Sequence, residues 1–473
     1  MQEHVTDTLV AVLPAGSSIL LGLSGGMDSV VLLHILHQIS PQRSWLLSAL
    51  HVHHGISPKA DAWAAFCSDL CARLDVPLRV ERVDITPLRH MGIEAAAREL
   101  RHAALTAQPV DYIALAHHQD DQAETLLLQL LRGAGVKGAA AMPLVKLVAA
   151  PTPFPSKVTN DLAAVAGQTS QMASSFIREG GGESGIPSGF ILRPLLDVSR
   201  AELVAYAKQH ELAWVEDESN ADDSYPRNFL RQRVMPLLMQ RFPACSETLA
   251  RSAQHFAEAS ELLDQLAQLD TQGAMQGDTL DVSCLRRLDT VRAKNLLRFF
   301  IASRGAPMPG SARLQEMLHQ LCDARADAAP CVAFGAWEVR RYQGRVYVFP
   351  TLAHPDTTWQ VQWNGESELA LPQLGGTLHF ESCAGQGLSL KKLEQGVVMV
   401  RLRQGAERMQ PDARRPVRSL KNLLQEHEVP PWRRDSLPLL FCDDELAAVP
   451  GLGVACAYQA TLHERGVQLR WAA

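Results

Sequence analysis

Residues 18–29 read SILLGLSGGMDS, and this stretch decides the fold. An apolar run at 18–23 leads through Ser24, Gly25, Gly26 and Met27 into DSVVLLHILHQI (28–39), which is apolar at helical spacing. Glycine allows a tight turn, and the first turn of the helix has free N–H groups, so such a turn presents donors to an anion. Ser24 and Ser29 add hydroxyl groups. The stretch therefore predicts a phosphate-binding turn that contains no lysine.

The alternation of strand and helix continues after this turn. Strand-like runs at 48–52, 78–85 and 112–118 alternate with helical patterns at 61–74 and 93–105. Such alternation predicts an α/β fold with a doubly wound, mostly parallel sheet. Ligands of these sheets bind beyond the carboxyl ends of the strands, in the turns that lead into helices.

The chain is too long, at 473 residues, for one ordinary core. We predict an α/β domain at 1–215, a mainly helical domain at 216–352 and a small mixed α+β domain at 353–473. Residues 147–189 are rich in Pro, Gly, Ser, Thr and Ala with little periodicity, and we interpret them as a mobile insertion. Residues 336–349 predict a hairpin closed at Gln343-Gly344.

Composition places the chain among soluble cytoplasmic proteins. The apolar fraction is 47%, no apolar run reaches membrane-spanning length, and no basic leader precedes the first strand. Nine cysteines without regular spacing are typical of reduced thiols. The net charge of −6 does not suggest a nucleic-acid binder, but residues 401–434 hold nine Arg or Lys against four Asp or Glu. That cluster can neutralise phosphates, and a solvated surface is an equally good interpretation.

Four motifs together resemble one family. The lysine of Walker A and the spacing G-x-G-x-x-G are both absent, whereas residues 24–29 resemble the SGGxDS signature of the PP-loop ATP pyrophosphatases. HVHHGISP (51–58), EAAARELR (94–101) and AHHQDDQAETLLLQLLRG (116–133) narrow the resemblance to the tRNA(Ile)-lysidine synthetases, and so do segments at 193–203, 216–234 and 401–453. The chain departs from the family at His53, where Asn is usual, and in its longer link between Met142 and Arg193.

The resemblance implies a ligase that forms a carbon–nitrogen bond with ATP and Mg²⁺. ATP adenylates C2 of the wobble cytidine in an isoleucine tRNA with a CAU anticodon, and pyrophosphate leaves. The ε-amine of free L-lysine then expels AMP. The modified base pairs with A instead of G, and the tRNA carries isoleucine instead of methionine. The resemblance assigns Ser24, Gly25, Gly26, Met27, Asp28 and Ser29 to ATP, and Asp28 is a candidate Mg²⁺ ligand whose structural alternative is a helix N-cap.

Asp121 and Glu124 are the candidate lysine-binding pair. They lie three residues apart and so share one helix face, while Leu126, Leu127, Leu130 and Leu131 are expected to face the core. Paired carboxylates can attract an ammonium group and take its proton, and the resemblance implies contact with lysine or metal. The structural alternative is a capping box, with Asp120 as a helix cap. We expect His117 and His118 to be structural or to contact the nucleotide.

Several arginines are candidates for phosphate contacts. Arg98 and Arg101 follow Glu94 at helical spacings, which fits either surface ion pairs or a catalytic clamp on ATP or tRNA phosphates. We expect at least one of them to act in catalysis, and the sequence leaves open which. A helix start near 227 and the 401–434 cluster, in which Trp432 lies beside two arginines, are expected to meet the tRNA backbone. The candidates are Arg227, Asn228, Arg231, Arg233, Arg403, Arg408, Arg414, Arg415, Arg418, Lys421, Arg433 and Arg434.

Two rival functions remain at this point. A PP-loop tRNA thiolase needs reactive cysteines, often at C-x-x-C spacing, and the nearest pair here, Cys67 and Cys71, is spaced C-x₃-C. A catalytically inactive tRNA-binding adapter would not need residues 24–29 or the Asp121–Glu124 pair. The sequence leaves the oligomeric state open, as it does the way the isoleucine tRNA is told from the methionine tRNA.

Overall fold

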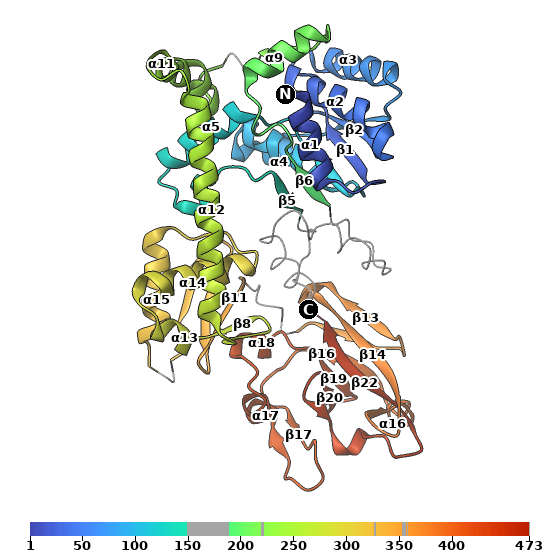
Figure 1. Ribbon diagram of the computed structural model, residues 1–473. Coiled ribbons are helices and arrows are strands. Elements are labelled where there is room, and N and C mark those ends of the chain that lie inside the picture. The colour runs from blue at the N-terminus through green and yellow to red at the C-terminus, as the bar shows by residue number, and fades with distance from the viewer. Residues whose placement is uncertain (149–188, 219–221, 326–327, 352–355, 357, 473) are drawn as a thin grey trace. The chain divides into compact units, whose positions relative to one another are not determined.

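The computed structural model describes residues 1–148, 189–218, 222–325, 328–351, 356 and 358–472. The predicted insertion at 147–189 lies almost wholly outside the described residues. The chain forms two compact units, of which the first ends at Leu266 and the second begins at Ala267 (Figure 1). The predicted domain borders at 215/216 and 352/353 stay predictions.

The first unit is built on a six-stranded sheet in the order β3-β2-β1-β4-β6-β5. All neighbouring strands are parallel except β5, which pairs with β6 in antiparallel register. This confirms the predicted doubly wound, mostly parallel α/β fold. The chain moves outward from β1 to β3 and then returns to β4 on the other side of β1. The carboxyl ends of β1 and β4 therefore flank the switch point where ligands of such sheets bind. The strands are β1 (Ser18–Gly22), β2 (Leu46–His53), β3 (Leu78–Arg82), β4 (Tyr112–Ala114), β5 (Val145–Leu147) and β6 (Phe190–Leu192).

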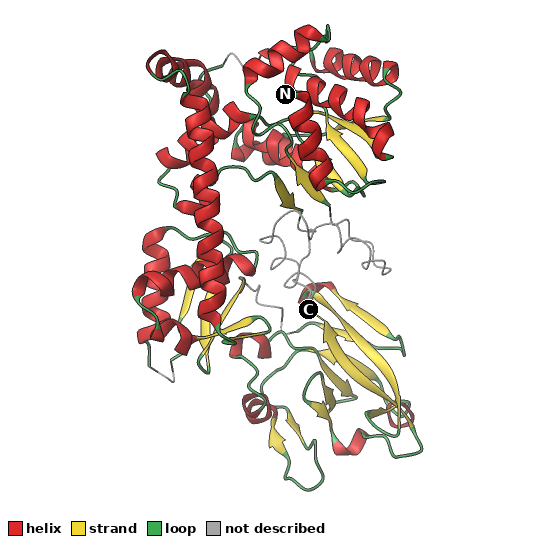
Figure 2. Cartoon of the chain, viewed as in Figure 1, coloured by secondary structure: helices red, strands yellow, loops and turns green. Residues whose placement is uncertain are grey.

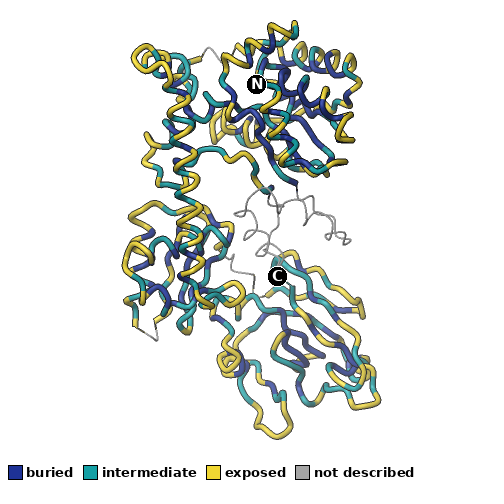
Figure 3. The backbone as a smooth tube through the Cα atoms, in the orientation of Figure 1, coloured by how far each residue is buried: buried dark blue, intermediate teal, exposed yellow. Residues whose placement is uncertain are grey.

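Helices cover this sheet and supply the rest of its core. Helix α2 is apolar almost all round and is buried between the sheet and neighbouring helices, which Figure 3 shows in dark blue. Ser199 caps α9 by accepting a hydrogen bond from Glu202 N, as is typical of a capping box. The helices are α1 (Gln2–Val12), α2 (Met27–Arg43), α3 (Ala60–Arg73), η1 (Thr86–Met91), α4 (Ile93–Thr106), α5 (Gln119–Leu131), α6 (Val136–Ala139) and α9 (Arg200–Gln209).

Helix α5 meets its core with only part of the predicted apolar face. Leu126 is buried and packs with Ala139 and Ala253. Leu130 and Leu131 are 45% and 74% exposed, so the prediction that they face the core is wrong. They lie in the last turn of α5, C-terminal to the buried residues of that helix, of which Leu126 is the last.

The first unit ends in a helical segment whose hydrogen-bonding pattern changes within a few residues. Helix α10 (Pro226–Phe229) runs into a π-helical turn, η3 (Leu230–Val234), and then into α11 (Met235–Arg241). Single π-helical turns are rare and occur mostly at functional sites. The long helix α12 (Cys245–Thr271) follows.

The second unit begins with helices packed on a five-stranded sheet in the order β7-β8-β11-β10-β9. The predicted hairpin is confirmed: β10 and β11 pair in antiparallel register, and Gln343 and Gly344 both have positive φ, as a tight two-residue turn requires. The elements are β7 (Met275–Gln276), β8 (Thr279–Asp281), α13 (Val282–Arg287), α14 (Thr290–Ser303), α15 (Ser311–Asp323), β9 (Cys331–Phe334), β10 (Trp337–Tyr342) and β11 (Arg345–Pro350).

The end of the second unit is mostly strands (Figure 2). Its sheets have the orders β12-β16-β19-β20-β21, β13-β14-β22-β15 and β17-β18, and all of their pairs are antiparallel. No helix in the described part of the chain is long and apolar enough to span a membrane. The elements are β12 (Gln360–Gln362), β13 (Glu368–Leu371), η4 (Pro372–Leu374), β14 (Gly376–Ala384), β15 (Leu388–Ser389), α16 (Leu390–Leu393), β16 (Val398–Arg401), β17 (Arg408–Met409), β18 (Arg418–Ser419), α17 (Leu420–Glu426), α18 (Pro431–Arg434), β19 (Leu439–Cys442), β20 (Glu445–Val449), β21 (Gly453–Val454), η5 (Cys456–Tyr458) and β22 (Arg465–Ala472).

Candidate active site

The turn between β1 and α2 has the geometry of an anion cradle. Gly25 has φ +85°, and a Cβ at this position would lie 2.9 Å from Val215 Cγ2 and 3.1 Å from Cys67 Sγ. Only glycine fits there. Gly26 is the N-cap of α2, and no side chain caps that helix, so its first N–H groups are free to meet a ligand.

The serines of the turn hold its shape. Ser24 Oγ lies 3.1 Å from Ser29 Oγ, and Ser29 Oγ donates a hydrogen bond to Gly26 O at 2.9 Å. Gly26 N donates to Ser24 Oγ at 3.3 Å. Ser24 is exposed, whereas Ser29 is buried. The two hydroxyl groups therefore brace the turn and lie beside the predicted phosphate position.

Asp28 points from the first turn of α2 toward the neighbouring strand end. The N-cap of α2 is Gly26, so Asp28 is not the cap. Its Oδ2 lies 3.6 Å from His118 Nε2, and its Oδ1 is buried without a hydrogen-bond partner. Burial raises the pKa of Asp28 above its usual value, and the nearby Asp121 adds to this rise. A carboxylate that is costly to bury, with one unpaired oxygen, is suited to receive a cation.

Asp121 and Glu124 come together at the start of α5 and are both buried, with exposed fractions of 8% and 2%. Asp121 Oδ2 accepts a hydrogen bond from His118 N at 3.0 Å, so part of the predicted capping role is real. Glu124 makes no such bond and faces cations instead. A buried pair of carboxylates needs compensating charge.

Arg227 and Arg231 supply that charge from α10 and η3. Arg227 binds Asp121 Oδ1 at 3.0 Å and Glu124 Oε2 at 2.9 Å. Arg231 binds Asp121 Oδ1 at 2.7 Å and Glu124 Oε1 at 2.6 Å. We call these four residues the carboxylate–arginine cluster. Burial raises the pKa of Asp121, but His118 and Arg227 outweigh burial and hold it at about 2. Contact of the two arginines with tRNA stays a prediction, and the structure gives them these partners instead.

Asp120 joins three helices. Its Oδ2 accepts a hydrogen bond from Arg200 N at 3.0 Å, at the start of α9, and its Oδ1 accepts one from Ser246 Oγ at 2.8 Å, at the start of α12. Asp120 therefore caps a helix, as expected, but the helix is α9 and not its own.

Buried polar atoms without hydrogen-bond partners cluster at the carboxyl ends of the strands of this sheet, which we call the sheet edge. Buried polar groups in folded proteins normally have hydrogen-bond partners, so each exception needs an explanation. Seven such side-chain atoms occur in the described part of the chain, and five of them belong to residues on or beside this edge. A bound ligand would satisfy them. The five are Asp28 Oδ1, His54 Nδ1, His117 Nδ1, His118 Nδ1 and Arg193 Nε.

Arg98 and Arg101 lie on α4 and are exposed. Burial and the charge of Arg101 together lower the pKa of His54 to about 4, so Arg101 lies near the loop after β2. Burial lowers the pKa of His117 to about 3, and the charges of Arg193 and Arg98 contribute to this lowering, so Arg98 lies on the side of His117. The two arginines thus face different parts of the sheet edge. Which of them acts in catalysis stays open.

The remaining predicted tRNA contacts are spread over two regions. Asn228 donates to Asp222 O, and Arg233 pairs with Asp223. In the second unit, Arg403 pairs with Asp435, Arg415 with Asp412 and Arg418 with Glu426. The exposed members of the 401–434 cluster are Arg408, Arg414, Arg415, Lys421 and Arg433.

Trp432 and Arg434 are partly buried, unlike these exposed residues. Trp432 stacks on Phe349 with ring centroids 5.6 Å apart, and Arg340 lies 5.2 Å from its ring. Arg434 Nη2 donates to Tyr342 Oη at 2.9 Å. Both side chains therefore fasten α18 to the β10–β11 hairpin within the second unit.

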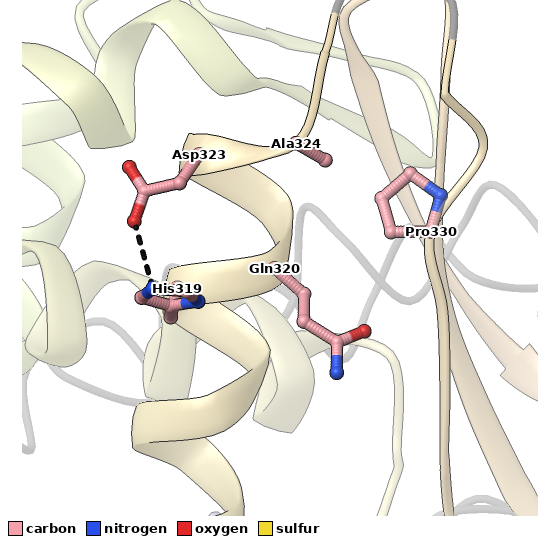
Figure 4. A pocket seen from close by; sticks show the side chains of 5 residues that line it. All are labelled: His319, Gln320, Asp323, Ala324 and Pro330. Carbon is pink, nitrogen blue, oxygen red and sulfur yellow. Dashed lines mark ion pairs between the residues drawn. The ribbon is translucent and has the colours of Figure 1, made fainter.

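Other features of the described residues do not compete with this site. The hollow in Figure 4, lined by His319, Gln320, Asp323, Ala324 and Pro330, carries a surface ion pair and none of the predicted site residues. No group of three His, Cys, Asp or Glu residues suited to a metal occurs in the ranges that the structure describes. Cys67 and Cys71 are buried, and burial raises the pKa of their thiols to about 12 and about 11.

Comparisons with known proteins cover most of the chain. The family model of the PP-loop domain matches residues 1–238, that of the TilS substrate binding domain matches 280–347, and that of the TilS substrate C-terminal domain matches 398–471. A protein of Nitrosomonas europaea named tRNA(Ile)-lysidine synthase is 41% identical over 96% of this chain and 92% of its own length. A protein of the same name from Azoarcus is 39% identical over 98% of this chain and 93% of its own length. The solved structure of a U34-tRNA thiolase from Methanococcus maripaludis matches 54% of this chain and 78% of its own with a TM-score of 0.39 and 16% identity.

Proposed function

The chain belongs to the tRNA(Ile)-lysidine synthase family, and on that premise we propose which of its residues perform each half of the reaction. The reaction is the ATP-dependent ligation of L-lysine to C2 of the wobble cytidine in the CAU-anticodon isoleucine tRNA. One observation carries the proposal. Three features meet at the carboxyl ends of β1 and β4: the free N–H groups of α2, Asp28 with one oxygen that lacks a hydrogen-bond partner, and the buried Asp121–Glu124 pair.

The first half-reaction uses the turn at residues 24–29. The cytidine O2 attacks the α-phosphorus of ATP, and the bond to the β,γ-pyrophosphate breaks. Negative charge grows on the leaving pyrophosphate, so donors fixed around it lower the barrier. The N–H groups of the first turn of α2 supply those donors. Asp28 fits Mg²⁺, because this ion is usually held by one or two carboxylates plus substrate phosphates, and there it would screen the phosphate charge.

The second half-reaction uses the carboxylate–arginine cluster. Asp121 and Glu124 attract the lysine ammonium group. One of these carboxylates takes a proton from the ammonium group, the resulting neutral ε-amine attacks C2, and the bond from C2 to the AMP oxygen breaks, so that AMP leaves. The four carboxylate oxygens already accept hydrogen bonds from His118 N, Arg227 and Arg231. Both carboxylates are also buried, so we infer that lysine reaches them by displacing at least one guanidinium group.

This arrangement argues against the thiolase alternative. Thiolation needs an accessible, ionisable sulfur, and burial raises the thiol pKa values of Cys67 and Cys71 far above neutral pH. An inactive adapter would have no need of two buried carboxylates with matched arginines. ATP, free lysine and tRNA meet in the cytoplasm, and we place the reaction there.

The direct test is incubation of the protein with ATP, radiolabelled lysine and the isoleucine tRNA. We expect label on the RNA, with AMP and pyrophosphate as the other products. Asp121→Asn should abolish the transfer, and Asp69→Asn, at an exposed position of α3, is the matched control that should retain it. Release of ADP and orthophosphate, or full transfer by Asp121→Asn, would contradict the proposal.

A further inference from the structure

Arg193 is a buried cation that lacks a described anionic partner. It follows β6 directly and is 8% exposed. Its Nη1 donates to Pro143 O at 2.8 Å, but its Nε is buried without any hydrogen bond. No carboxylate of the described residues forms an ion pair with it. Burying a guanidinium group in this way costs free energy unless a ligand completes its hydrogen bonds.

Another buried arginine of this chain, Arg341, has a structural role, and its hydrogen bonding differs from that of Arg193. Arg341 is 2% exposed and also lacks a carboxylate partner, but its guanidinium group donates to the carbonyls of Leu321, Ala324 and Arg325 at the end of α15. Those carbonyls are the unsatisfied acceptors of a helix end. Arg193 binds one carbonyl from its side chain, so a structural role accounts for less of its burial.

The charges around Arg193 are mostly of its own sign. Burial and the guanidinium group of Arg98 together lower the pKa of Arg193 to about 10. Burial lowers the pKa of His102, and Lys146, Arg98 and Arg193 lower it further against the opposing effect of Glu99. Two arginines and a lysine therefore gather at this edge, where an anion would relieve their repulsion.

Sheet register places Arg193 beside the reactive end of β4. Ala114 pairs with Leu192 across β4 and β6, and His118 forms an isolated parallel bridge with Leu195. Arg193 thus lies next to the segment that carries His117 and leads into Asp121. The phosphate turn follows β1, two strands away and so on the order of 10 Å distant in the sheet. The sheet edge therefore carries two separate positions suited to anions.

We propose that Arg193, together with Arg98, binds a backbone phosphate of the RNA next to the nucleotide that reacts. This inference rests on the proposed function for the presence of RNA. The turn at 24–29 already provides for the phosphates of ATP. A cytidine brought between Asp28 and Asp121 has flanking phosphates that also need partners near these residues. On the β6 side, these two guanidinium groups have no ion-pair partner among the described residues, and arginine forks suit phosphate oxygens.

The test separates the two sources of phosphate. tRNA binding by Arg193→Gln, Arg98→Gln and Arg193→Lys is measured by filter retention over a series of KCl concentrations, and ATP binding is measured by calorimetry without RNA. Loss of one phosphate contact should reduce the slope of log K against log salt by about 0.7–0.9, and we expect this in both glutamine variants. Arg193→Lys should keep the slope but not the full affinity, because lysine lacks the planar fork. Arg43→Gln, at the far end of α2, is the control that should match wild type.

Each outcome decides the inference. Weaker ATP binding with unchanged tRNA binding would assign the anion to ATP and overturn the RNA assignment. No change in either would overturn the anion site altogether. If Arg193→Gln does not fold, the exposed Arg98→Gln carries the same slope test. Lysine is absent from these measurements, so failure of lysine transfer would leave them interpretable and would count against the proposed function alone.

Discussion

Replacing Gly25 by alanine tests the phosphate turn most sharply, because the chain offers a matched control at Gly16. Gly25 has φ +85° and Gly16 has φ +80°, so alanine at either position costs about 1–2 kcal/mol of folding free energy for the left-handed backbone. Around Gly16 nothing lies within 4 Å of the added Cβ, whereas at Gly25 it would lie 2.9 Å from Val215 Cγ2. Overpacking of this kind adds about 1–3 kcal/mol. We therefore expect Gly25→Ala to destabilise the protein about twice as much as Gly16→Ala.

The functional difference between the two variants should be larger than the difference in stability. The Gly25 substitution displaces the turn that aims the N–H groups of α2, and loss of one preorganised donor costs about 3 kcal/mol at the transition state. tRNA-dependent ATP–pyrophosphate exchange should fall by about a hundredfold in Gly25→Ala and stay near wild type in Gly16→Ala. Thermal denaturation of both variants measures the loss of folding stability that each substitution causes. Equal exchange rates for the two variants would refute the idea that this turn holds the phosphates.

Three further outcomes follow from the contacts of single side chains. The folded-state pKa of Asp121, about 2, lies below its ordinary value of 3.8, so this group stabilises the fold above about pH 4 and loses that contribution as the pH falls toward 2. Asp121→Asn should therefore flatten the acid limb of stability against pH, and an unchanged limb would contradict the assigned charge. Arg433→Ala should weaken tRNA binding and reduce its salt dependence without lowering the melting temperature, because Arg433 is exposed. Arg434→Ala should lower the melting temperature, because the hydrogen bond to Tyr342 is lost. The reverse pattern would show that the two roles are exchanged. The double variant with Ala at Cys67 and Cys71 should still transfer lysine, and sulfur transfer to the tRNA by the unmutated protein that this variant lacks would revive the thiolase alternative.

The strand–turn–helix at residues 18–39 could be predicted because its determinants are local. A strand, a glycine turn and a helix occupy residues 18–39, and each leaves its own pattern of spacing in the sequence. The doubly wound sheet and the Gln343-Gly344 hairpin follow from the same kind of local signal. Leu131 shows the limit of such patterns. Helical spacing tells which face a residue shares but not where along the helix the packing partners end.

The carboxylate–arginine cluster could not be predicted, because its partners are about a hundred residues apart. Glu124 meets Arg227 and Arg231 across an interval that contains β5, β6 and α9. Viewed as a local pattern, the basic stretch at 227–233 resembled a phosphate contact. Trp432 is misleading in the same way, since its neighbours Arg433 and Arg434 are close in sequence, but its packing partner Phe349 lies in β11, far from it in the sequence. Arg193 directly follows the apolar run at 190–192, and a charged residue at such a position is a candidate for burial that the sequence could reveal.

Charge balance connects these findings. Two buried carboxylates without counter-ions would destabilise the fold. A protein that binds a cationic substrate between them therefore needs other cations to neutralise them before that substrate is bound. Arg227 and Arg231 provide these cations from a short helix and a π-helical turn, a type of turn associated with functional sites. At Arg193 the signs are reversed: cations gather there without a described anion, and the RNA that we propose as its partner is the anionic substrate. The Asp121–Glu124 half of the site thus calls for a cation, whereas the Arg193 half calls for an anion. Under the two proposals, lysine completes the charge of one half and the tRNA backbone completes that of the other, so the carboxyl ends of the strands would distinguish the two charged substrates by sign before any bond forms.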